Sequence, residues 1–160
     1  MMKLPGALLL ITGFFLSCRN WILQRREELC RLEELTIALE HMSAMIRMKK
    51  EPILQAAHYQ KNRTHCGALF QQLTNMMHSD HTLQYAWNQT FSAVQPVEAA
   101  NILNSVELSG DESRITGGLN LAANQLRELA ACRRAQQKQN ERLCLTLGSC
   151  LAGVIVIMLI

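Results

Sequence analysis

Hydrophobic residues gather at both ends of the chain, and between them apolar and polar positions alternate at helical spacing. Residues 143–160 form a run of 18 without a charged side chain. At about 1.5 Å of rise per residue, such a helix covers roughly 27 Å, close to the thickness of the hydrocarbon core of a bilayer. A surface helix of a soluble domain normally keeps a charged face, which is missing here, and the alternative is a buried core helix. The pattern therefore predicts a transmembrane helix over residues 143–160.

A second uncharged run covers residues 4–18, and after a two-residue polar break three more apolar residues follow. Arg19 can place its charged head among lipid headgroups, and Trp21 suits the aromatic belt at the membrane surface. We therefore expect an N-terminal transmembrane helix over residues 4–23. The alternative is a secretory signal with lipoprotein-type cleavage before Cys18, because the apolar core also has the length of a signal.

Small residues recur within both apolar runs. Gly148 and Ala152 are four residues apart, and Gly153 follows, a spacing that lets a second helix approach closely. Gly6 and Gly13 offer a small face in the first run. We expect these five residues to pack helices against one another inside the membrane.

Basic residues near the two predicted spans indicate their orientation. Lys3 is the only basic residue beyond the outer ends of the two spans, whereas several basic residues lie near their inner ends. By the positive-inside rule, we therefore expect residues 24–142, between the spans, to be cytoplasmic. The six cysteines follow no paired spacing and suit a reducing compartment, so Cys66 should report the side of the membrane on which this segment lies. The basic residues near the ends of the segment are Arg25, Arg26, Arg31, Arg133, Arg134, Lys138 and Arg142.

The segment between the spans shows helical periodicity and no strand pattern. Two long helices are expected, one from Arg25 to about Met48 and one from Asp111 into the C-terminal span, with a Ser109-Gly110-Asp111 break before the second. Three or four shorter helices lie between them. The fold class is therefore all-α, an antiparallel bundle of about six helices whose first and last helices continue into transmembrane segments. The apolar seams of the long helices are Leu32, Leu35, Leu39, Met42 and Ile46, and then Ile115, Leu119, Ala122, Leu126 and Leu129.

The shorter helices are predicted from start signals and apolar faces. Pro52 and Pro96 suit first helical turns, Thr64 suits a cap, and Ser79 with Asp80 marks another start. Gly117 and Gly118 inside the last long helix indicate a close neighbour or a bend. The residues expected to face inward are Ile53, Leu54, Ala56, Ala57, Tyr59, Leu69, Phe70, Leu73, Met76 or Met77, Leu83, Ala86, Trp87, Phe91, Val97, Ala100, Leu103, Val106 and Leu108.

Acidic residues crowd the beginning of the first long helix. Glu27, Glu28, Glu33 and Glu34 form either a solvated face or a docking surface for a basic partner, and the sequence leaves both interpretations open. The net charge of +3 and the lack of a basic stripe with aromatic residues exclude nucleic acid as an expected partner.

Motifs of catalysis and cofactor binding are missing from the sequence. It has no phosphate-binding loop, no G-x-S-x-G and no H-E-x-x-H. His78 and His81 have a usable spacing for a metal but span a predicted helix break, and no second ligand pair lies at a zinc-like interval. We therefore expect no enzyme activity, no cofactor and no metal site.

Several short motifs follow one another in a fixed order along nearly the whole chain. They are Gly6 in a short apolar start, Arg31-Leu32-x-x-Leu35 with Ala38-Leu39-Glu40, Pro52-Ile53-Leu54-x-Ala56, Ala86-Trp87, Leu108-x-Gly110-Asp111, and Leu147-Gly148-x-x-Ala152-Gly153. In this order and spacing they resemble the stage III sporulation protein AB family. The sequence departs from the family pattern where Met48-Lys49-Lys50 replaces a glycine before the proline turn, and around Asp111.

The resemblance implies a two-pass membrane component of the secretion apparatus between mother cell and forespore, on the mother-cell side of the outer forespore membrane. Its cytoplasmic part is similar to the helical domains of type II secretion and type IV pilus platform proteins. Such platforms bind a hexameric secretion ATPase, here the stage III sporulation protein AA by analogy, and neighbouring membrane subunits of the channel. The alternative function, after cleavage before Cys18, is a lipid-anchored extracytoplasmic helical sensor or chaperone.

Overall fold

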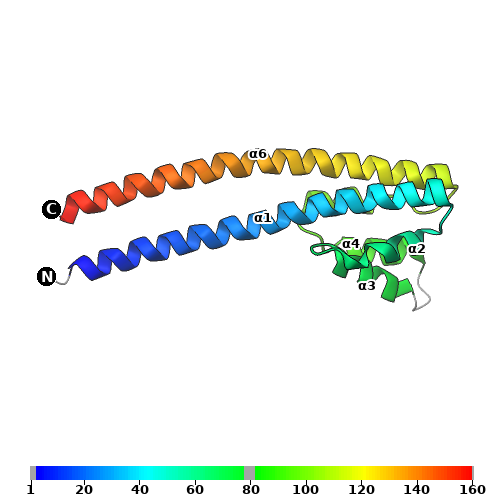
Figure 1. Ribbon diagram of the computed structural model, residues 1–160, viewed down its shortest axis with the longest axis horizontal. Coiled ribbons are helices and arrows are strands. Elements are labelled where there is room, and N and C mark those ends of the chain that lie inside the picture. Colours follow the sequence, from blue (N-terminus) through cyan, green and yellow to red (C-terminus); the bar gives the residue numbers. More distant parts are fainter. Residues whose placement is uncertain (1–2, 78–81, 160) are drawn as a thin grey trace. The chain divides into compact units, whose positions relative to one another are not determined.

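The computed structural model describes residues 3–77 and 82–159, and that part of the chain contains helices and no strand (Figure 1). The predicted all-α class is therefore confirmed. The predicted helix start at Ser79 and Asp80 lies outside the described residues. The elements are α1 (Lys3–Lys49), α2 (Ile53–His58), the 3₁₀ helix η1 (Tyr59–Asn62), α3 (Gly67–Met77), α4 (Leu83–Phe91), α5 (Val97–Asn104) and α6 (Glu112–Leu159).

The chain divides into two compact units, one of residues 28–131 and one that combines residues 1–27 with 132–160. The hydrophobic core belongs to residues 28–131. Both predicted seams of the long helices face this core, since every seam residue is buried except Leu129, which is partly buried and packs against it. Periodicity alone therefore located the buried faces of α1 and α6.

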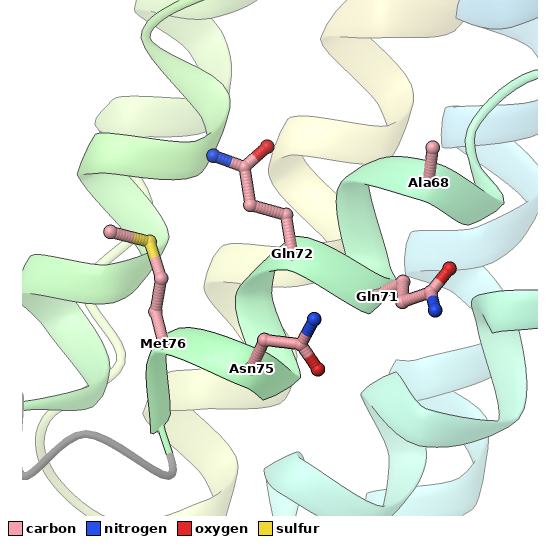
Figure 2. Close-up of a pocket in the computed structure, with 5 residues that line it drawn as sticks. All are labelled: Ala68, Gln71, Gln72, Asn75 and Met76. Carbon is pink, nitrogen blue, oxygen red and sulfur yellow. The ribbon is translucent and has the colours of Figure 1, made fainter.

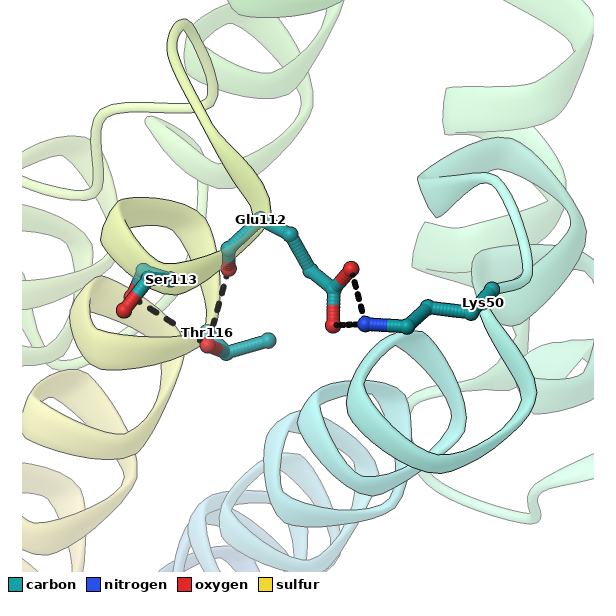
Figure 3. A network of polar contacts seen from close by, with 4 residues as sticks. All are labelled: Lys50, Glu112, Ser113 and Thr116. Atoms are coloured by element: carbon teal, nitrogen blue, oxygen red, sulfur yellow. Dashed lines mark hydrogen bonds and ion pairs between the residues drawn. The ribbon is translucent and has the colours of Figure 1, made fainter.

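Within residues 28–131, α1 and α6 are antiparallel. Ser43 Oγ donates to the Thr116 carbonyl oxygen at 3.4 Å, and Lys50 Nζ lies 2.6 Å from a carboxylate oxygen of Glu112. Further from this end, Arg127 pairs with Glu40. As residue numbers increase along α6, the residue numbers of the partners on the α1 side decrease, as expected for an antiparallel pair. Figure 3 shows the Lys50–Glu112 pair and the Thr116 hydroxyl, which donates to the Glu112 carbonyl oxygen at 2.8 Å.

The short helices pack around one aromatic group. Trp87, Phe70 and Phe91 are fully buried, and the Trp87 and Phe91 ring centroids are 4.4 Å apart. Trp87 Nε1 donates to the Leu103 carbonyl oxygen at 2.8 Å, which links α4 to α5. The indole therefore fills the core and also satisfies a backbone acceptor at the end of α5.

Three of the residues expected to face inward are instead exposed: Leu54 by 37%, Tyr59 by 52% and Val97 by 60%. The chain changes from α2 to the 3₁₀ helix η1 at Tyr59. A 3₁₀ helix has three residues per turn instead of 3.6. The buried face predicted for one continuous α-helix therefore does not extend past this point. Val97 is the first residue of α5 and lies on the side away from the core, since Ala99 and Ala100 are the buried residues of the same turn.

The predicted break before the second long helix is confirmed. Gly110 has a positive φ of 124°, and Asp111 Oδ1 accepts a hydrogen bond from the Arg114 N–H at 3.2 Å, as an N-cap does. The expected close neighbour at the glycine pair is not found. A methyl group at Gly118 would lie 3.7 Å from Val106 Cγ1, which is ordinary contact, and one at Gly117 would meet nothing within 4 Å.

The unit of residues 1–27 and 132–160 carries a polar stretch. Arg26 lies 3.6 Å from Glu141, and the Arg25 guanidinium lies 5.7 Å from the centre of the Trp21 ring. Gln137 donates to Glu141 at 3.1 Å. Of these contacts, the one between Arg26 and Glu141 joins the two segments of the unit, and the other two lie within single helices.

Among the described residues, none of the helices has a stretch that is both long and apolar enough to cross a membrane. The predicted spans over residues 4–23 and 143–160 therefore have no support from the structure. Of the five small residues expected to pack there, Gly148 is buried, and a methyl group at Gly13 would meet nothing within 4 Å. The surroundings of Gly6, Ala152 and Gly153 lie outside the described part.

Candidate partner-binding surface

Glu34, one of the four acidic residues predicted for docking, is bound to the chain's own backbone. Its Oε2 atom accepts hydrogen bonds from the N–H groups of His65 at 2.7 Å and Cys66 at 3.1 Å. These donors immediately precede α3, which begins at Gly67, and the first N–H groups of a helix lack partners within it. Glu34 of α1 therefore caps the beginning of α3, a role that was predicted from the sequence for Thr64.

The electrostatics of Glu34 agree with this role. Partial burial alone would raise the pKa of its carboxyl group, but the two backbone hydrogen bonds and the neighbouring His65 ring together lower the pKa below the ordinary value of 4.5. The carboxylate is therefore ionised at neutral pH and holds the beginning of α3 on α1.

The other three acidic residues are placed differently. Glu27 is exposed, whereas Glu28 and Glu33 are partly buried on α1. Since Glu34 is occupied within the chain, the predicted docking face reduces to these three residues. For them docking stays a prediction.

A second polar contact fixes η1 on α1. Gln60 is 1% exposed, and its Nε2 atom lies 2.8 Å from His41 Nδ1. Its Oε1 atom accepts a hydrogen bond from Arg63 Nε at 2.8 Å. A buried side-chain amide whose nitrogen and oxygen both have hydrogen-bond partners has a structural role. No pattern in the sequence predicted this role for Gln60.

Gly67 marks where α3 begins against η1. A methyl group there would lie 2.3 Å from the Lys61 carbonyl oxygen, and the Gly67 N–H donates to the Arg63 carbonyl oxygen at 3.1 Å. Only a residue without Cβ fits this approach of backbone to backbone. Together with Glu34 and Gln60, it fixes the position of η1 and α3.

Cys66 is buried, so the expectation that it reports on accessibility is wrong. Burial, together with the Glu34 carboxylate beside it, raises the pKa of the Cys66 thiol to about 12. A neutral, shielded thiol reacts slowly, because the thiolate is the nucleophile. Cys30 and Cys132 are exposed and suit labelling instead.

A groove of about 560 Å³ opens between α2, η1 and α3. Leu54 and Tyr59, two of the three residues wrongly expected to be buried, contribute to its wall. Sequence reasoning missed the groove because it assigned these side chains to the core. The lining residues are Pro52, Leu54, Gln55, His58, Tyr59 and Thr74.

A second hollow of about 400 Å³ lies along α3 and is lined mainly by side-chain amides (Figure 2). Met76, at one end of it, accepts a hydrogen bond through Sδ from the Thr90 hydroxyl at 3.6 Å. Neither α3 nor α4 contains a charged residue. The lining residues are Ala68, Gln71, Gln72, Asn75 and Met76.

Metal-ligating side chains do not gather in the described part of the chain, where no group of three or more His, Cys, Asp or Glu residues is placed to hold an ion. His78 and His81, the pair singled out in the sequence, lie outside the described residues. The two concave surfaces described above are mainly apolar or lined by amides. Such surfaces suit contacts with another polypeptide.

These features define the chain as an all-helical protein built on two long antiparallel helices, with an open groove beside its short helices. The model of the family "Stage III sporulation protein AB" matches residues 3–160. The chain belongs to this family, and the resemblance in the sequence motifs is confirmed. No curated protein and no solved structure matches the chain.

Proposed function

We propose that the chain is a non-catalytic membrane platform of the sporulation secretion complex. In this proposal residues 4–23 and 143–160 enter the membrane, and the helical domain between them lies in the cytoplasm of the mother cell. The domain docks a hexameric secretion ATPase, the stage III sporulation protein AA by family analogy, and the terminal segments contact other membrane subunits of the channel.

The observation that carries the proposal is the continuity of the two long helices. α1 has 47 residues and α6 has 48, and each passes without interruption from the packed unit of residues 28–131 into the other unit. An uninterrupted helix resists bending, because every backbone group within it is hydrogen bonded. Helices of this kind can pass a displacement from a docked motor protein to the terminal segments.

The polar contacts between α1 and α6 support the same mechanical role. Ser43 with Thr116 and the ion pair Glu40–Arg127 cross from one helix to the other, and Lys50, which directly follows α1, pairs with Glu112 at the start of α6. These contacts define the register of the two helices, and the buried apolar seams oppose sliding of one helix past the other. The pair would then move as one body.

The continuity of α1 also favours this proposal over the lipid-anchored alternative. The backbone is helical from Lys3 to Lys49 and passes through Cys18 without an extended segment. A cleavage site is expected to carry small residues, whereas the bulky Phe15 and Leu16 lie close before Cys18.

The test is binding between the purified full chain, kept in detergent micelles, and the purified hexameric ATPase. We expect a complex that elutes together in size-exclusion chromatography and dissociates at high salt. A matched control uses another hexameric ATPase of the same cells. If both partners are folded and no complex forms in detergent or in lipid nanodiscs, the platform proposal is wrong.

A further inference from the structure

The groove between α2, η1 and α3 has an apolar wall that the chain itself leaves uncovered. Tyr59 is 52% exposed at its edge and Leu54 is 37% exposed. Tyrosine combines a large apolar ring with a polar tip and is enriched where binding energy concentrates in protein interfaces. Pro52 stiffens the same wall at the start of α2, so its shape is set before a partner arrives.

Positive charge concentrates around this groove. Residues 47–65, which include α2 and η1, contain five Lys or Arg residues and one Glu, which gives 5 − 1 = +4. The whole of residues 28–131 contains eight Lys or Arg and eleven Asp or Glu, which gives 8 − 11 = −3. The remainder of the unit therefore carries −3 − 4 = −7, and five of the six groove residues come from this basic stretch.

Some of these charges have partners within the chain. Lys50 is paired with Glu112, and Arg63 is hydrogen bonded to Gln60. Arg47 and Lys49 are exposed at the end of α1, and Lys61 is partly exposed in η1. Lys49 precedes the groove residue Pro52 by three positions, and Lys61 follows the groove residue Tyr59 by two. Basic residues thus flank the groove residues in the sequence, before Pro52 and after Tyr59.

This combination selects a polypeptide over a lipid surface as the occupant. A concave groove of about 560 Å³ accommodates one or two protruding side chains, whereas a flat layer of headgroups cannot fill it. Acidic residues on either side of those side chains would face Lys49 and Lys61, and such complementarity also speeds encounter.

We propose, on the basis of the proposed function, that the ATPase binds here through an acidic segment bearing an aliphatic or aromatic side chain. That side chain enters the groove beside Tyr59 and Leu54. Its acidic neighbours contact the basic residues of positions 47–61. The docking surface is thus on the α2 side of the domain and not on the acidic beginning of α1.

The first test compares Tyr59→Ser and Leu54→Asp with Tyr85→Ser, since Tyr85 on α4 has the same 52% exposure as Tyr59. With the full chain in detergent and the purified ATPase as the probe, we expect the first two variants to bind at least tenfold more weakly and Tyr85→Ser to bind within twofold of wild type. Thermal unfolding followed by circular dichroism verifies that each variant is folded. Equal binding by Tyr59→Ser and wild type overturns the inference.

The second test addresses charge. The double variant Lys49→Gln with Lys61→Gln, which changes the net charge by −2 as the control below does, should weaken binding about tenfold and reduce its dependence on salt. The control Asn120→Glu with Gln125→Glu adds negative charge at exposed positions of α6 and should change binding less than twofold. Equal losses from both double variants would mean that only net charge matters, which overturns a specific site.

A photo-crosslinking amino acid in place of Tyr59 identifies the occupant. We expect a crosslink to an acidic segment of the ATPase. A crosslink to a basic segment, to a second copy of this chain or to lipid overturns the inference. These outcomes remain distinct from failure of the proposed function, because that failure appears as absence of binding by the wild-type chain itself.

Discussion

The long helices and the short helices of the packed unit are held by different means. In α1 and α6 the buried positions recur every three or four residues, and the apolar seams account for the packing. Helices α2 to α5 have between six and eleven residues, lengths at which isolated helices are unstable in water. They depend on single contacts from elsewhere in the chain, such as those of Glu34, Gln60 and Trp87.

The two regions also differ in charge. α3 and α4 contain no charged residue, whereas ion pairs such as Lys50–Glu112 lie along the long helices or at their ends. The comparison teaches that a regular helix pair can serve as a scaffold on which a more specific surface is assembled. Changes at the specific contacts should therefore have large effects, and changes at exposed ion pairs should have small ones.

The largest effect is expected at Gly67. Gly67→Ala places a methyl group 2.3 Å from a backbone oxygen, so α3 must move away from η1, at a cost of about 3 kcal/mol in the free energy of unfolding. The matched control Gly117→Ala lies in the open face of a long helix and should stabilise by about 1 kcal/mol. Urea unfolding of both variants measures the difference. Equal effects would contradict the close approach at Gly67.

The next effect is expected at Trp87. Trp87→Phe leaves a cavity and removes the donor from the Leu103 carbonyl oxygen, so we expect a loss of about 2 kcal/mol. Tyr59→Phe, at an aromatic residue that is 52% exposed, should change the free energy of unfolding by less than about 0.5 kcal/mol. A Trp87→Phe variant as stable as wild type would show that the indole hydrogen bond contributes nothing.

A smaller, pH-dependent effect is expected at Glu34. Glu34→Gln weakens the capping of α3 and should cost about 1 kcal/mol at pH 7. Because folding lowers the pKa of Glu34, its contribution is complete above the ordinary value of 4.5 and disappears as pH falls through the lower folded value. Denaturant unfolding of wild type and variant should therefore converge in acid. Glu128→Gln at an exposed position is the control. A difference that persists unchanged at low pH would contradict the role of the charge.

The smallest effect is expected at the end of the long helix pair. Lys50 and Glu112 are 72% and 36% exposed, and exposed ion pairs contribute little. A double-mutant cycle with Lys50→Ala and Glu112→Ala should give a coupling below about 0.5 kcal/mol. A coupling energy several times larger would contradict this comparison, because the long helices would then depend on single contacts as the short helices do.

The sequence predicted the long helices well and the contacts of the short helices poorly, for a physical reason. The seam from Leu32 to Ile46 is a local repeat, so its buried face can be drawn from spacing alone. The bond from Glu34 to the backbone of Cys66 joins residues 32 positions apart and leaves no local signature. Tyr59 was misplaced because a switch to 3₁₀ winding cannot be seen in an apolar pattern, and the groove was missed with it.

The central claim, a cytoplasmic domain that docks an ATPase, is tested most directly by thiol labelling in intact cells. The chain would keep the exposed Cys30 and the shielded Cys66, with alanine at the other four cysteines. A variant that also carries Cys30→Ala controls for labelling elsewhere. We predict that a membrane-impermeant maleimide labels Cys30 only after the membrane is permeabilised. Labelling of Cys30 in intact cells would place the domain away from ATP and contradict the account.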